Sequence, residues 1–459
     1  MENTITIKET LLTLTESKKF SVIKEILITM NSVDIAYLFE ELPNEILPKL
    51  FRLLPKELAA ETFVEIDSSL QELLVKSFSD KELREVINEL YVDDAVDIIE
   101  EMPANVVNRI LKQASPDMRK DINELLKYPE DSAGSVMTTE FVNLKSNVTV
   151  EAALEHIHKT ALDKETVNTC YVTESDRVLI GSVSLRTLII ANPTDIIRDI
   201  METNVMSVTT DTDQEAVALL FDKYDHIAMP VVDNENRLVG IVTVDDAIDV
   251  IQEEASEDIE KMAAILPSEK PYFKTGVFET FKSRIPWLLF LMISATFTGA
   301  IISKFELQLT TYAALIVFIP MLMGTGGNSG SQSSVTVIRA LSLGDIEFRD
   351  IWQVIWKELR VSAICGLVLG VINFVKLYLI DYLLLNNFDA KVAIYEMLVV
   401  CITLFFVVVV AKIIGCTLPI VAKRLGFDPA VMASPLVTTI LDAFSLLIYF
   451  TVASFVLNI

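Results

Sequence analysis

The spacing of apolar residues divides the chain into three regions. Up to about residue 127, apolar positions recur every three or four residues with few glycines between them, which predicts a series of amphipathic helices. From about residue 137 to 254, short β-branched runs alternate with amphipathic helices. From about residue 286 onward, long apolar segments carry few charges, which predicts helices that cross a membrane. The pattern therefore predicts several domains of different architecture.

The first region contains an internal repeat. DIAYLFEELP at Asp34 to Pro43 and DAVDIIEEMP at Asp94 to Pro103 share an Asp, a Glu pair and a Pro. Stacked helical hairpins that form a short superhelix explain such a repeat.

The middle region contains one pattern twice. VTVEAALEHIHKT precedes CYVTESDRVLIGSVSLRTLI, and TDQEAVALLFDKYD precedes MPVVDNENRLVGIVTVDDAIDVI. Each copy predicts helix, strand, polar turn, strand and helix, with turns at residues 174–176 and 233–236. The two copies resemble a tandem pair of CBS domains, an α/β fold.

The CBS resemblance implies binding of ATP or another adenine nucleotide. The second copy keeps the family pattern G-x-x-T-x-x-D as Gly240, Thr243 and Asp246. The first copy has Gly181, Ser184 and Thr187 instead, so the carboxylate that would bind ribose is missing there. An ordinary strand-to-helix junction, capped by Thr243 or Asp245, explains the pattern equally well.

The last region predicts five membrane spans. Its apolar segments lie at about 286–302, 309–341, 361–385, 394–418 and 431–456, and roughly 20 residues are needed to cross the hydrocarbon. The flanks expected in the cytosol carry eight basic residues: Lys282, Arg284, Arg339, Arg349, Lys357, Arg360, Lys423 and Arg424. The outer loops carry only Lys304 and Lys391. This asymmetry predicts a cytoplasmic N-terminus and a C-terminus outside.

The net negative charge lies entirely in the part of the chain before the apolar segments. The chain has a net charge of −26, and all of it lies before residue 285, because the remainder has ten acidic and ten basic residues. Such an acidic surface disfavours nucleic acid and favours cations or basic partners. The four cysteines and three histidines are not spaced as a disulfide framework or a zinc site.

The second apolar segment is interrupted by Pro320 and then by GTGGNSGSQSS from Gly324 to Ser334. Irregular backbone at membrane depth must face protein or a watery cavity. Its carbonyls, with Asn328 and Gln332, would offer oxygen dipoles to a hydrated hard cation. The alternative is close helix packing through small residues.

The fifth segment contains one carboxylate, Asp442, which is the only acidic residue between Met432 and the C-terminus. A lone intramembrane carboxylate costs roughly 2.5 kcal/mol or more and usually marks a transport pathway. Two copies facing each other across a dimer axis would compensate one divalent cation. Magnesium prefers octahedral oxygen and holds its water tightly, so such a site would contact the hydrated ion.

Three segments make the resemblance specific. YPEDSAGSVMT at Tyr128 to Thr138, GTGGNSGSQ in the second span and DPAVMASPLVTTILD at Asp428 to Asp442 look like signatures of the MgtE family, in the family's order. The resemblance covers nearly the full chain. It implies an all-α superhelical N-domain (1–130), tandem CBS domains (131–254), an acidic linker and connecting or plug helix (255–284), and a five-helix pore domain (285–459).

The resemblance also implies a function and its residues. The chain is expected to be no enzyme but a homodimeric, magnesium-selective channel of the cell membrane, with an ion path at Asp442, Asn328, Gly324, Gly327 and Gln332. Cytosolic magnesium would close it by bridging acidic domain interfaces. The positions implied for that regulatory magnesium are Asp93, Asp97, Gly134, Asp213, Glu215, Asp225, Asp246, Asp249, Glu254, Glu257, Asp258 and Asp428.

Other interpretations of the same residues stay open. Each soluble acid taken singly is explained by a solvated helix face, and Asp428 by capping of the helix that begins at Pro429. An ion-coupled secondary transporter for magnesium, cobalt or manganese would need a second titratable membrane site, for which Lys376, Lys412 and Glu396 are candidates. A receptor-like module would leave Asp442 unexplained. No GxxxxGK[ST] loop is present, which disfavours a P-loop transport ATPase.

Overall fold

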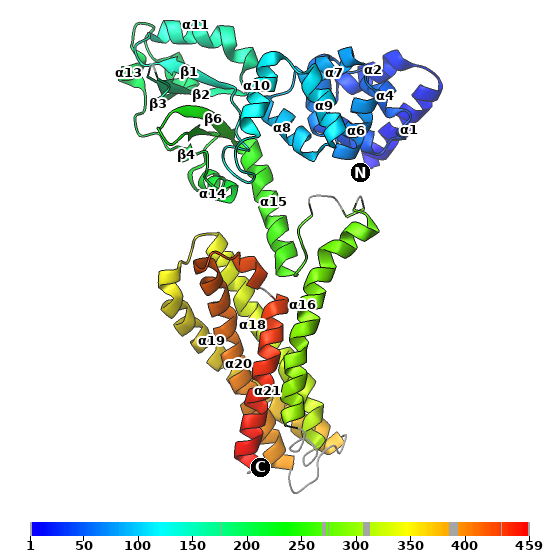
Figure 1. Cartoon of the computed structure of the whole chain (residues 1–459), viewed down its shortest axis with the longest axis vertical. Helices are drawn as coiled ribbons and strands as arrows, with labels where there is room; N and C mark the ends of the chain where they lie inside the picture. The colour runs from blue at the N-terminus through cyan, green and yellow to red at the C-terminus, as the bar shows by residue number, and fades with distance from the viewer. Residues whose placement is uncertain are drawn as a thin grey trace. The chain divides into compact units, whose positions relative to one another are not determined.

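The computed structural model describes residues 2–174, 176–268, 272–273, 275–305, 313–384, 393–432 and 434–457. The chain forms two compact units, Met1–Ile251 and Gln252–Ile459. Figure 1 shows both units, with labels on most of their helices and strands.

The first unit begins with ten short helices, as the apolar spacing predicts. They are α1 Glu2–Glu16, α2 Phe20–Ile28, α3 Ser32–Glu40, α4 Leu47–Phe51, α5 Lys56–Val64, α6 Ser68–Ser77, α7 Asp80–Ile87, α8 Val92–Glu101, α9 Ala104–Gln113 and α10 Pro116–Leu125. Capping side chains explain where several begin. Asn31 and Asp67 cap α3 and α6, and Ser79 forms a reciprocal capping box with Glu82 at α7.

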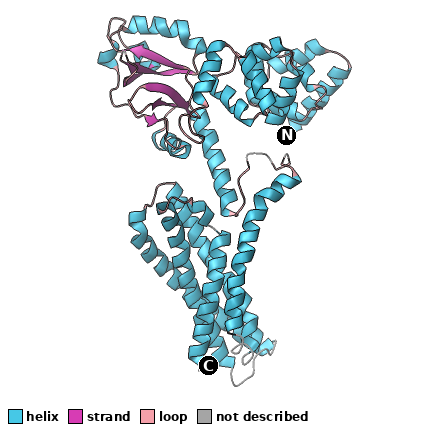
Figure 2. Ribbon diagram, in the orientation of Figure 1, coloured by secondary structure: helices cyan, strands magenta, loops and turns pink. Residues whose placement is uncertain are grey.

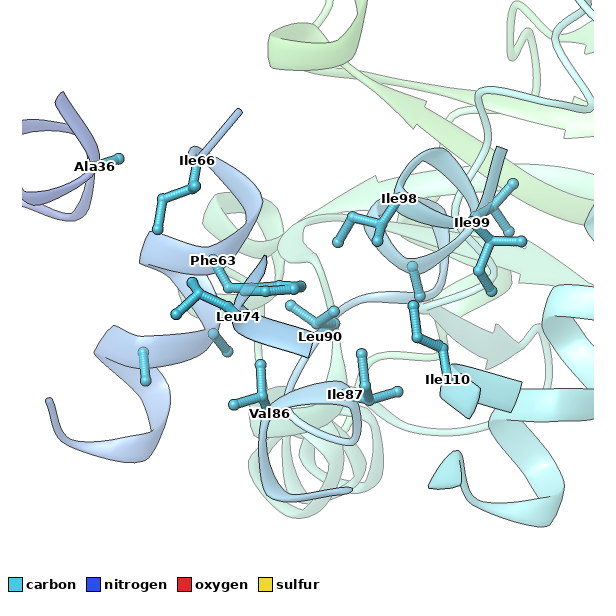
Figure 3. Packing of buried hydrophobic residues seen from close by; sticks show 14 of the residues in the cluster. Ala36, Phe63, Ile66, Leu74, Val86, Ile87, Leu90, Ile98, Ile99 and Ile110 are labelled. Atoms are coloured by element: carbon cyan, nitrogen blue, oxygen red, sulfur yellow. The ribbon is translucent and has the colours of Figure 1, made fainter. Parts of the chain in front are cut away.

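The helices share one apolar core that runs from repeat to repeat. Figure 3 shows Phe63 and Leu74 beside Leu90, Val86 and Ile87, and then Ile98, Ile99 and Ile110 further along. The same core continues into the second half of the CBS pair, through buried residues that include Val217, Phe221 and Met229. The helical part and the CBS pair are therefore packed together, and α8 lies against the sheet region.

The CBS part contains two three-stranded sheets of the same topology (Figure 2). The first has β1 Phe141–Lys145 parallel to β2 Thr166–Thr173, which is antiparallel to β3 Leu179–Ser184. The second repeats this with β4 Val208–Thr209, β5 Ala228–Val232 and β6 Leu238–Thr243. The associated helices are α11 Val150–Thr160, the 3-10 turn Ala161–Asp163, α12 Leu185–Ile190, α13 Ile197–Ile200, α14 Gln214–Tyr224 and α15 Val244–Met262. The predicted internal duplication is confirmed.

The second unit is helical. Its elements are α16 Val277–Lys304, the 3-10 helix η2 Ala313–Phe318, α18 Ile319–Ser342, the 3-10 helix η3 Phe348–Asp350, α19 Ile351–Lys376, the π-helix η4 Leu377–Leu384, α20 Ala393–Arg424, the 3-10 helix η5 Pro429–Met432 and α21 Ser434–Leu457. Among the described residues, four stretches are long and apolar enough to cross a membrane: Val277–Lys304, Phe348–Ile380, Ile394–Arg424 and Pro429–Leu457. An all-α region with apolar helices is thus confirmed, whereas α18, which lies in the predicted second span, is not among these four stretches because its GTGGNSGSQSS segment lowers its apolar content.

One expectation about this unit is corrected. The second segment is not broken: α18 runs without interruption through Gly324 to Ser334, and Pro320 lies in its first turn, where a missing N–H leaves no carbonyl unpaired. Helix α16 runs from Val277 through Pro286 to Lys304, so the end of the expected connecting helix and the start of the first expected span lie in one helix. The outer-loop residue Lys391 and the turn residue Ser175 lie outside the described residues.

Candidate functional site

Helix α18 has two different faces. Gly324, Asn328 and Gln332 recur every four residues, and all three are exposed. Residues at this spacing lie on one side of a helix. The opposite side is buried and consists mainly of glycine and serine: Gly326, Gly327, Ser329, Gly330, Ser333 and Ser334. The segment is therefore a helix with one packed face and one polar face.

The packed face brings α18 into close contact with α20 and α21. A methyl group on Gly330 would clash with Leu441 and approach the carbonyl of Ala411, and one on Gly415 would meet the backbone of Gly330 itself. Gly327 packs against Thr438 in the same way. Small residues allow helix backbones to approach this closely. Helix packing, one of the two alternatives left open, accounts for this face. Asn328 and Gln332 lie on the exposed face and take no part in that packing.

Asp442 lies on α21 and is half-buried. It is one turn after Thr438, whose methyl group packs on Gly327, and one residue after Leu441, which packs on Gly330. The carboxylate thus belongs to the stretch of α21 that packs on the glycine-rich part of α18. Carbonyls of an intact helix are already bonded within it, so oxygen ligands in this region come from side chains such as those of Asn328, Gln332 and Asp442.

A polar chain of three side chains joins α18, α19 and α20 beside this region. The buried ammonium of Lys412 donates to Ser333 Oγ at 3.3 Å, and Ser333 Oγ donates to Glu358 Oε2 at 2.6 Å. A buried charge needs such partners. This chain shows that Lys412 does not reach out to a membrane interface but is bonded inside the helix bundle.

Five carboxylates gather in the first unit, between α8 and the CBS part: Asp93, Asp94, Glu140, Glu165 and Asp246. We call them the α8 acidic cluster. Asp93 is 8% exposed, and its Oδ1 accepts no hydrogen bond from any described residue. Glu165 Oε2 is likewise buried without a partner. Glu140 accepts from the backbone N–H of Val92, at the start of α8, at 3.1 Å.

The electrostatics of the cluster are those of crowded like charges. Burial raises the pKa of Glu165 to about 8 and of Asp94 to about 7, and neighbouring carboxylates, Asp245 and Asp246 among them, contribute to both shifts. Burial also raises the pKa of Asp246 to about 6, although hydrogen bonds from Thr243 oppose the shift. The pKa of Asp93 is well above its usual range, first through burial and then through Asp246 and Asp94. The charged groups that act most strongly on Asp93, Asp94 and Glu165 are other carboxylates, whereas Lys164 acts on Glu140 and lowers its pKa.

The residues expected to hold a nucleotide are engaged within the second CBS copy. Asp246 Oδ2 accepts from the Thr243 hydroxyl at 2.5 Å and from its backbone N–H at 3.3 Å. A methyl group on Gly240 would clash with Met137 and the carbonyl of Thr138. In the first copy, Ser184 caps α12 by accepting from the Thr187 N–H. A side-chain cap is thus present at Ser184 in the first copy, whereas in the second copy Thr243 donates to Asp246, which belongs to the α8 acidic cluster.

A second group of expected magnesium ligands lies around the loop before α14. The N–H of Gly134 donates to the carbonyl of Thr210, and Ser132 forms an antiparallel backbone bridge with Asp213. The side chain of Asp213 caps α14 by accepting from the N–H groups of Glu215 and Ala216. Asp225 ends the same helix in a left-handed conformation, at the opposite end.

Two other expected ligands lie on different helices. Asp97 is exposed on α8, one turn beyond Asp93. Asp249 has a pKa raised by burial and by Asp245.

The third group lies in the second unit, where the end of α15 meets the loop before η5. Lys261 Nζ is 2.7 Å from Glu257 Oε1 and 2.7 Å from Asp428 Oδ2. Asp428 also accepts from the N–H of Ala430 through Oδ1, as expected of a cap. Asp258 accepts from Ser342 Oγ at 3.5 Å, and its pKa is raised by burial and by Asp428. Glu254 is one turn earlier on α15.

The structure brings these predicted ligands together only in part. Within the described residues, no three His, Cys, Asp or Glu side chains converge closely enough to bind a metal ion by themselves. Asp94, Glu140 and Glu165 were not predicted as site residues. Asp94 carried a signal, since it adjoins Asp93 and repeats Asp34, but Glu140 and Glu165 reach α8 only through the tertiary fold.

Comparison with known proteins identifies all three regions. The chain matches the model of the MgtE divalent cation transporter at residues 319–452, of the MgtE intracellular N domain at 30–131, and of the CBS domain at 133–193 and 197–253. It is 38% identical over 440 residues to the magnesium transporter MgtE of Thermus thermophilus, covering 95% of both chains. It is 33% identical to that of Bacillus subtilis, covering 92% of this chain and 91% of the relative.

Solved structures match the cytosolic portion. The cytosolic domain of the Mg²⁺ channel MgtE in complex with ATP superimposes with a TM-score of 0.51 and 37% identity, covering 53% of this chain and 99% of that one. The soluble part of a magnesium transporter gives the same TM-score at 30% identity, covering 55% and 99%. The predicted resemblance is confirmed over nearly the whole length. The chain belongs to the MgtE family of divalent cation transporters, which is a family of transport proteins and not of enzymes.

Proposed function

We propose that the chain is a magnesium channel that works as a homodimer in the cell membrane and is closed by cytosolic magnesium. Its relatives include magnesium transporters and a Mg²⁺ channel, which supports the choice of ion. Magnesium entry needs no coupled energy source, because a divalent ion gains about 4.6 kcal/mol per 100 mV of inward-negative potential.

The observation that carries the proposal is the exposed polar face of α18. A membrane helix that presents an amide every turn to hydrocarbon is unfavourable, so Gly324, Asn328 and Gln332 are expected to face water or a second copy. We assign them, with Gly327 at the packed contact and Asp442 on α21, to the ion path. With α18 included, the membrane part has five spans.

A dimer axis along this face gives the path its charge. Two copies of Asp442 would supply two negative charges for one hydrated divalent cation, and the amides would contact its waters. The basic residues beside the spans then favour a cytoplasmic N-terminus and an outer C-terminus.

Closure is assigned to the acidic residues of the soluble part. Carboxylates that repel each other across an interface separate it, and a divalent cation between them reverses the sign of that interaction. The buried Asp93 Oδ1, which accepts no hydrogen bond within the described part of the chain, supports this for the α8 acidic cluster. The full set proposed to contact regulatory magnesium is Asp93, Asp97, Gly134, Asp213, Glu215, Asp225, Asp246, Asp249, Glu254, Glu257, Asp258 and Asp428.

Adenine nucleotide is proposed as a second regulator at the CBS pair. The support is the relative whose cytosolic domain was solved with ATP. The G-x-x-T-x-x-D residues of the second copy, Gly240, Thr243 and Asp246, are the proposed contacts, although Asp246 would have to share its carboxylate with Thr243.

Magnesium flux into liposomes tests the proposal. Wild type, Asp442→Asn and the control Asp345→Asn, which alters an exposed loop carboxylate, are reconstituted with a magnesium-sensitive dye inside. Wild type and the control should pass magnesium when the solution that bathes the soluble domains is low in magnesium. The flux through Asp442→Asn should be at least about tenfold lower, because the path then lacks the counter-charge for the ion. Equal flux through Asp442→Asn would remove Asp442 from the path.

A coupled transporter is the second candidate, and the buried chain Lys412, Ser333 and Glu358 favours it, since coupling needs a titratable site inside the membrane. The two functions differ in one measurement. A channel conducts magnesium when the pH is equal on the two sides and sodium is absent from both. A coupled transporter stops when the proton and sodium gradients are removed.

A further inference from the structure

The end of α15 holds a positive charge inside a group of carboxylates. Lys261 Nζ contacts Glu257 Oε1, one turn earlier on its own helix, and Asp428 Oδ2, which is remote in sequence. Both distances are 2.7 Å, and the Lys261 side chain is only 23% exposed. Asp258 adds a third carboxylate beside Asp428. We call these four residues the Lys261 junction.

The junction differs from the α8 acidic cluster in its charge balance. In that cluster the charged groups acting most strongly on Asp93, Asp94 and Glu165 are other carboxylates. At the junction one ammonium lies between two carboxylates. Hydrogen bonds from Lys261 to Asp428 and Glu257 outweigh burial there, so the pKa of Lys261 is above its usual value and the ammonium stays charged.

An ammonium and a magnesium ion cannot use these oxygens together. Magnesium binds oxygen at about 2.0 to 2.1 Å and demands a near-octahedral shell, while Lys261 already occupies one oxygen of Glu257 and one of Asp428. Two positive charges in that space repel. Lys261 is also tethered to the site, so its effective concentration is high and does not depend on the solution.

We infer that Lys261 is a built-in competitor of the divalent cation at Glu257, Asp258 and Asp428, and that it holds α15 against the loop before η5 when no metal is bound. This regulation rests on the proposed function of the same carboxylates. Because Lys261 replaces the metal, the junction stays together at low magnesium, and the conformational change that depends on magnesium takes place at the α8 acidic cluster. Met262, next to Lys261 in sequence, packs against Ile338 and against Ala430, which is two residues after Asp428, so the junction would hold this apolar contact as well.

An ordinary exposed ion pair would explain the geometry without any such effect, because most contribute little. The chain offers a matched example. Lys159 pairs with Glu155 one turn away on α11, and their side chains are 69% and 67% exposed. Lys261 differs by its partial burial and by its second partner from another segment.

Hydrogen exchange on the full chain in detergent separates the two cases. The variants are Lys261→Met, Lys261→Arg and the control Lys159→Met, each with EDTA or with magnesium chloride. The readout is the backbone exchange of residues 427–432, where Ala430 N–H donates to Asp428. Wild type, Lys261→Arg and the control should show equal protection in both solutions. Lys261→Met should exchange about tenfold faster in EDTA, because three carboxylates then repel, and magnesium should restore protection.

Magnesium flux provides an independent readout. Lys261→Met should need about tenfold more magnesium to close than wild type, since closure then requires a cation at the junction as well as in the α8 acidic cluster. If Lys261→Met exchanges like wild type in EDTA, or if magnesium fails to restore its protection, the inference is wrong. If wild type passes no magnesium at all, the proposed function fails, whereas the exchange result still decides whether Lys261 holds the junction and yields to the metal.

Discussion

Asp94, Glu165 and Asp246 bind protons more tightly than ordinary carboxyl groups, and this has a measurable effect on stability. Their ordinary pKa values are 3.8 for Asp and 4.5 for Glu, and burial raises them to about 7, 8 and 6. Between the two sets of values the folded state holds more protons than the unfolded state. The free energy of unfolding therefore falls as pH rises through the raised values.

We predict a corresponding shift in melting temperature. A soluble fragment ending at Leu266 should melt about 5 °C lower at about pH 8.5 than at about pH 5.5 in EDTA, because one pKa unit corresponds to about 1.4 kcal/mol and a domain of this size loses a few degrees per kcal/mol. Differential scanning calorimetry measures it. Saturating magnesium should remove most of the difference, since a bound cation replaces the protons.

The control for this prediction changes one charge in the cluster and one outside it. Asp94→Asn should raise the melting temperature at the alkaline end and flatten the pH dependence, whereas Asp80→Asn, an exposed residue that pairs with Arg109, should leave the pH dependence unchanged. A wild-type melting temperature that rises with pH over this range would contradict the prediction. It would show that ionising the carboxylates of the cluster does not destabilise the folded state.

At the residue scale, the resemblance implied one role for Asp93, Asp246 and Asp249 without indicating which of them lie together. The structure places Asp93 and Asp246 in one cluster. Glu140 and Glu165 were missed because they follow a loop and precede a strand, and only the packing of α8 on the CBS part brings them there. Sequence spacing reports faces of one helix and not contacts between elements.

At the element scale, α18 shows the limit of composition. Glycine and serine lower helix propensity, by about 1 kcal/mol for each glycine, and the segment therefore suggested irregular backbone. The structure forms a helix because the same small residues let α20 and α21 pack closely. Residue type alone could not separate these outcomes, since both a pore loop and a close packing face require small side chains.

We predict that this close packing tolerates no added methyl group. Gly415→Ala should reduce the stability of the detergent-purified protein by about 1–3 kcal/mol and abolish magnesium flux, because its Cβ would fall on the Gly330 backbone. Gly299→Ala is the matched control: it lies within α16, and a Cβ there meets nothing within 4 Å. Size-exclusion chromatography after heating to a series of temperatures compares the stability of the two variants, and the liposome assay compares their flux. Similar profiles for the two variants would mean that α18 and α20 can separate without loss.

At the scale of the whole molecule, the three regions and the two internal repeats followed from periodicity, because each repeat presents its own apolar face. What periodicity does not report is which faces stay uncovered. Ile189 and Ile190 on α12 are 68% and 74% exposed, and Ile248 and Ile251 on α15 are half exposed or nearly so. The two helices hold equivalent places in the two CBS copies. A second copy of the chain is the proposed cover for these side chains.

We predict that a charge at this surface separates the proposed dimer. Ile190→Glu should shift the soluble fragment from dimer to monomer in multi-angle light scattering, because a carboxylate would have to be buried in an apolar interface. Leu162→Glu is the control, since Leu162 is 96% exposed but stands alone on the 3-10 turn after α11. Both variants remaining dimeric would move the interface away from α12.

The contact between Gly330 and Gly415 has a mechanical consequence. Two helices that touch backbone to backbone have no side chains between them that could change rotamer, so neither rotation about their axes nor sliding along them is available without breaking the contact. They must move as one rigid body. Helix α16 has no buried residue along its 28 residues, so its tilt is far less restrained, and any displacement that opens or narrows a path is expected in α16 and not in the α18–α20 pair.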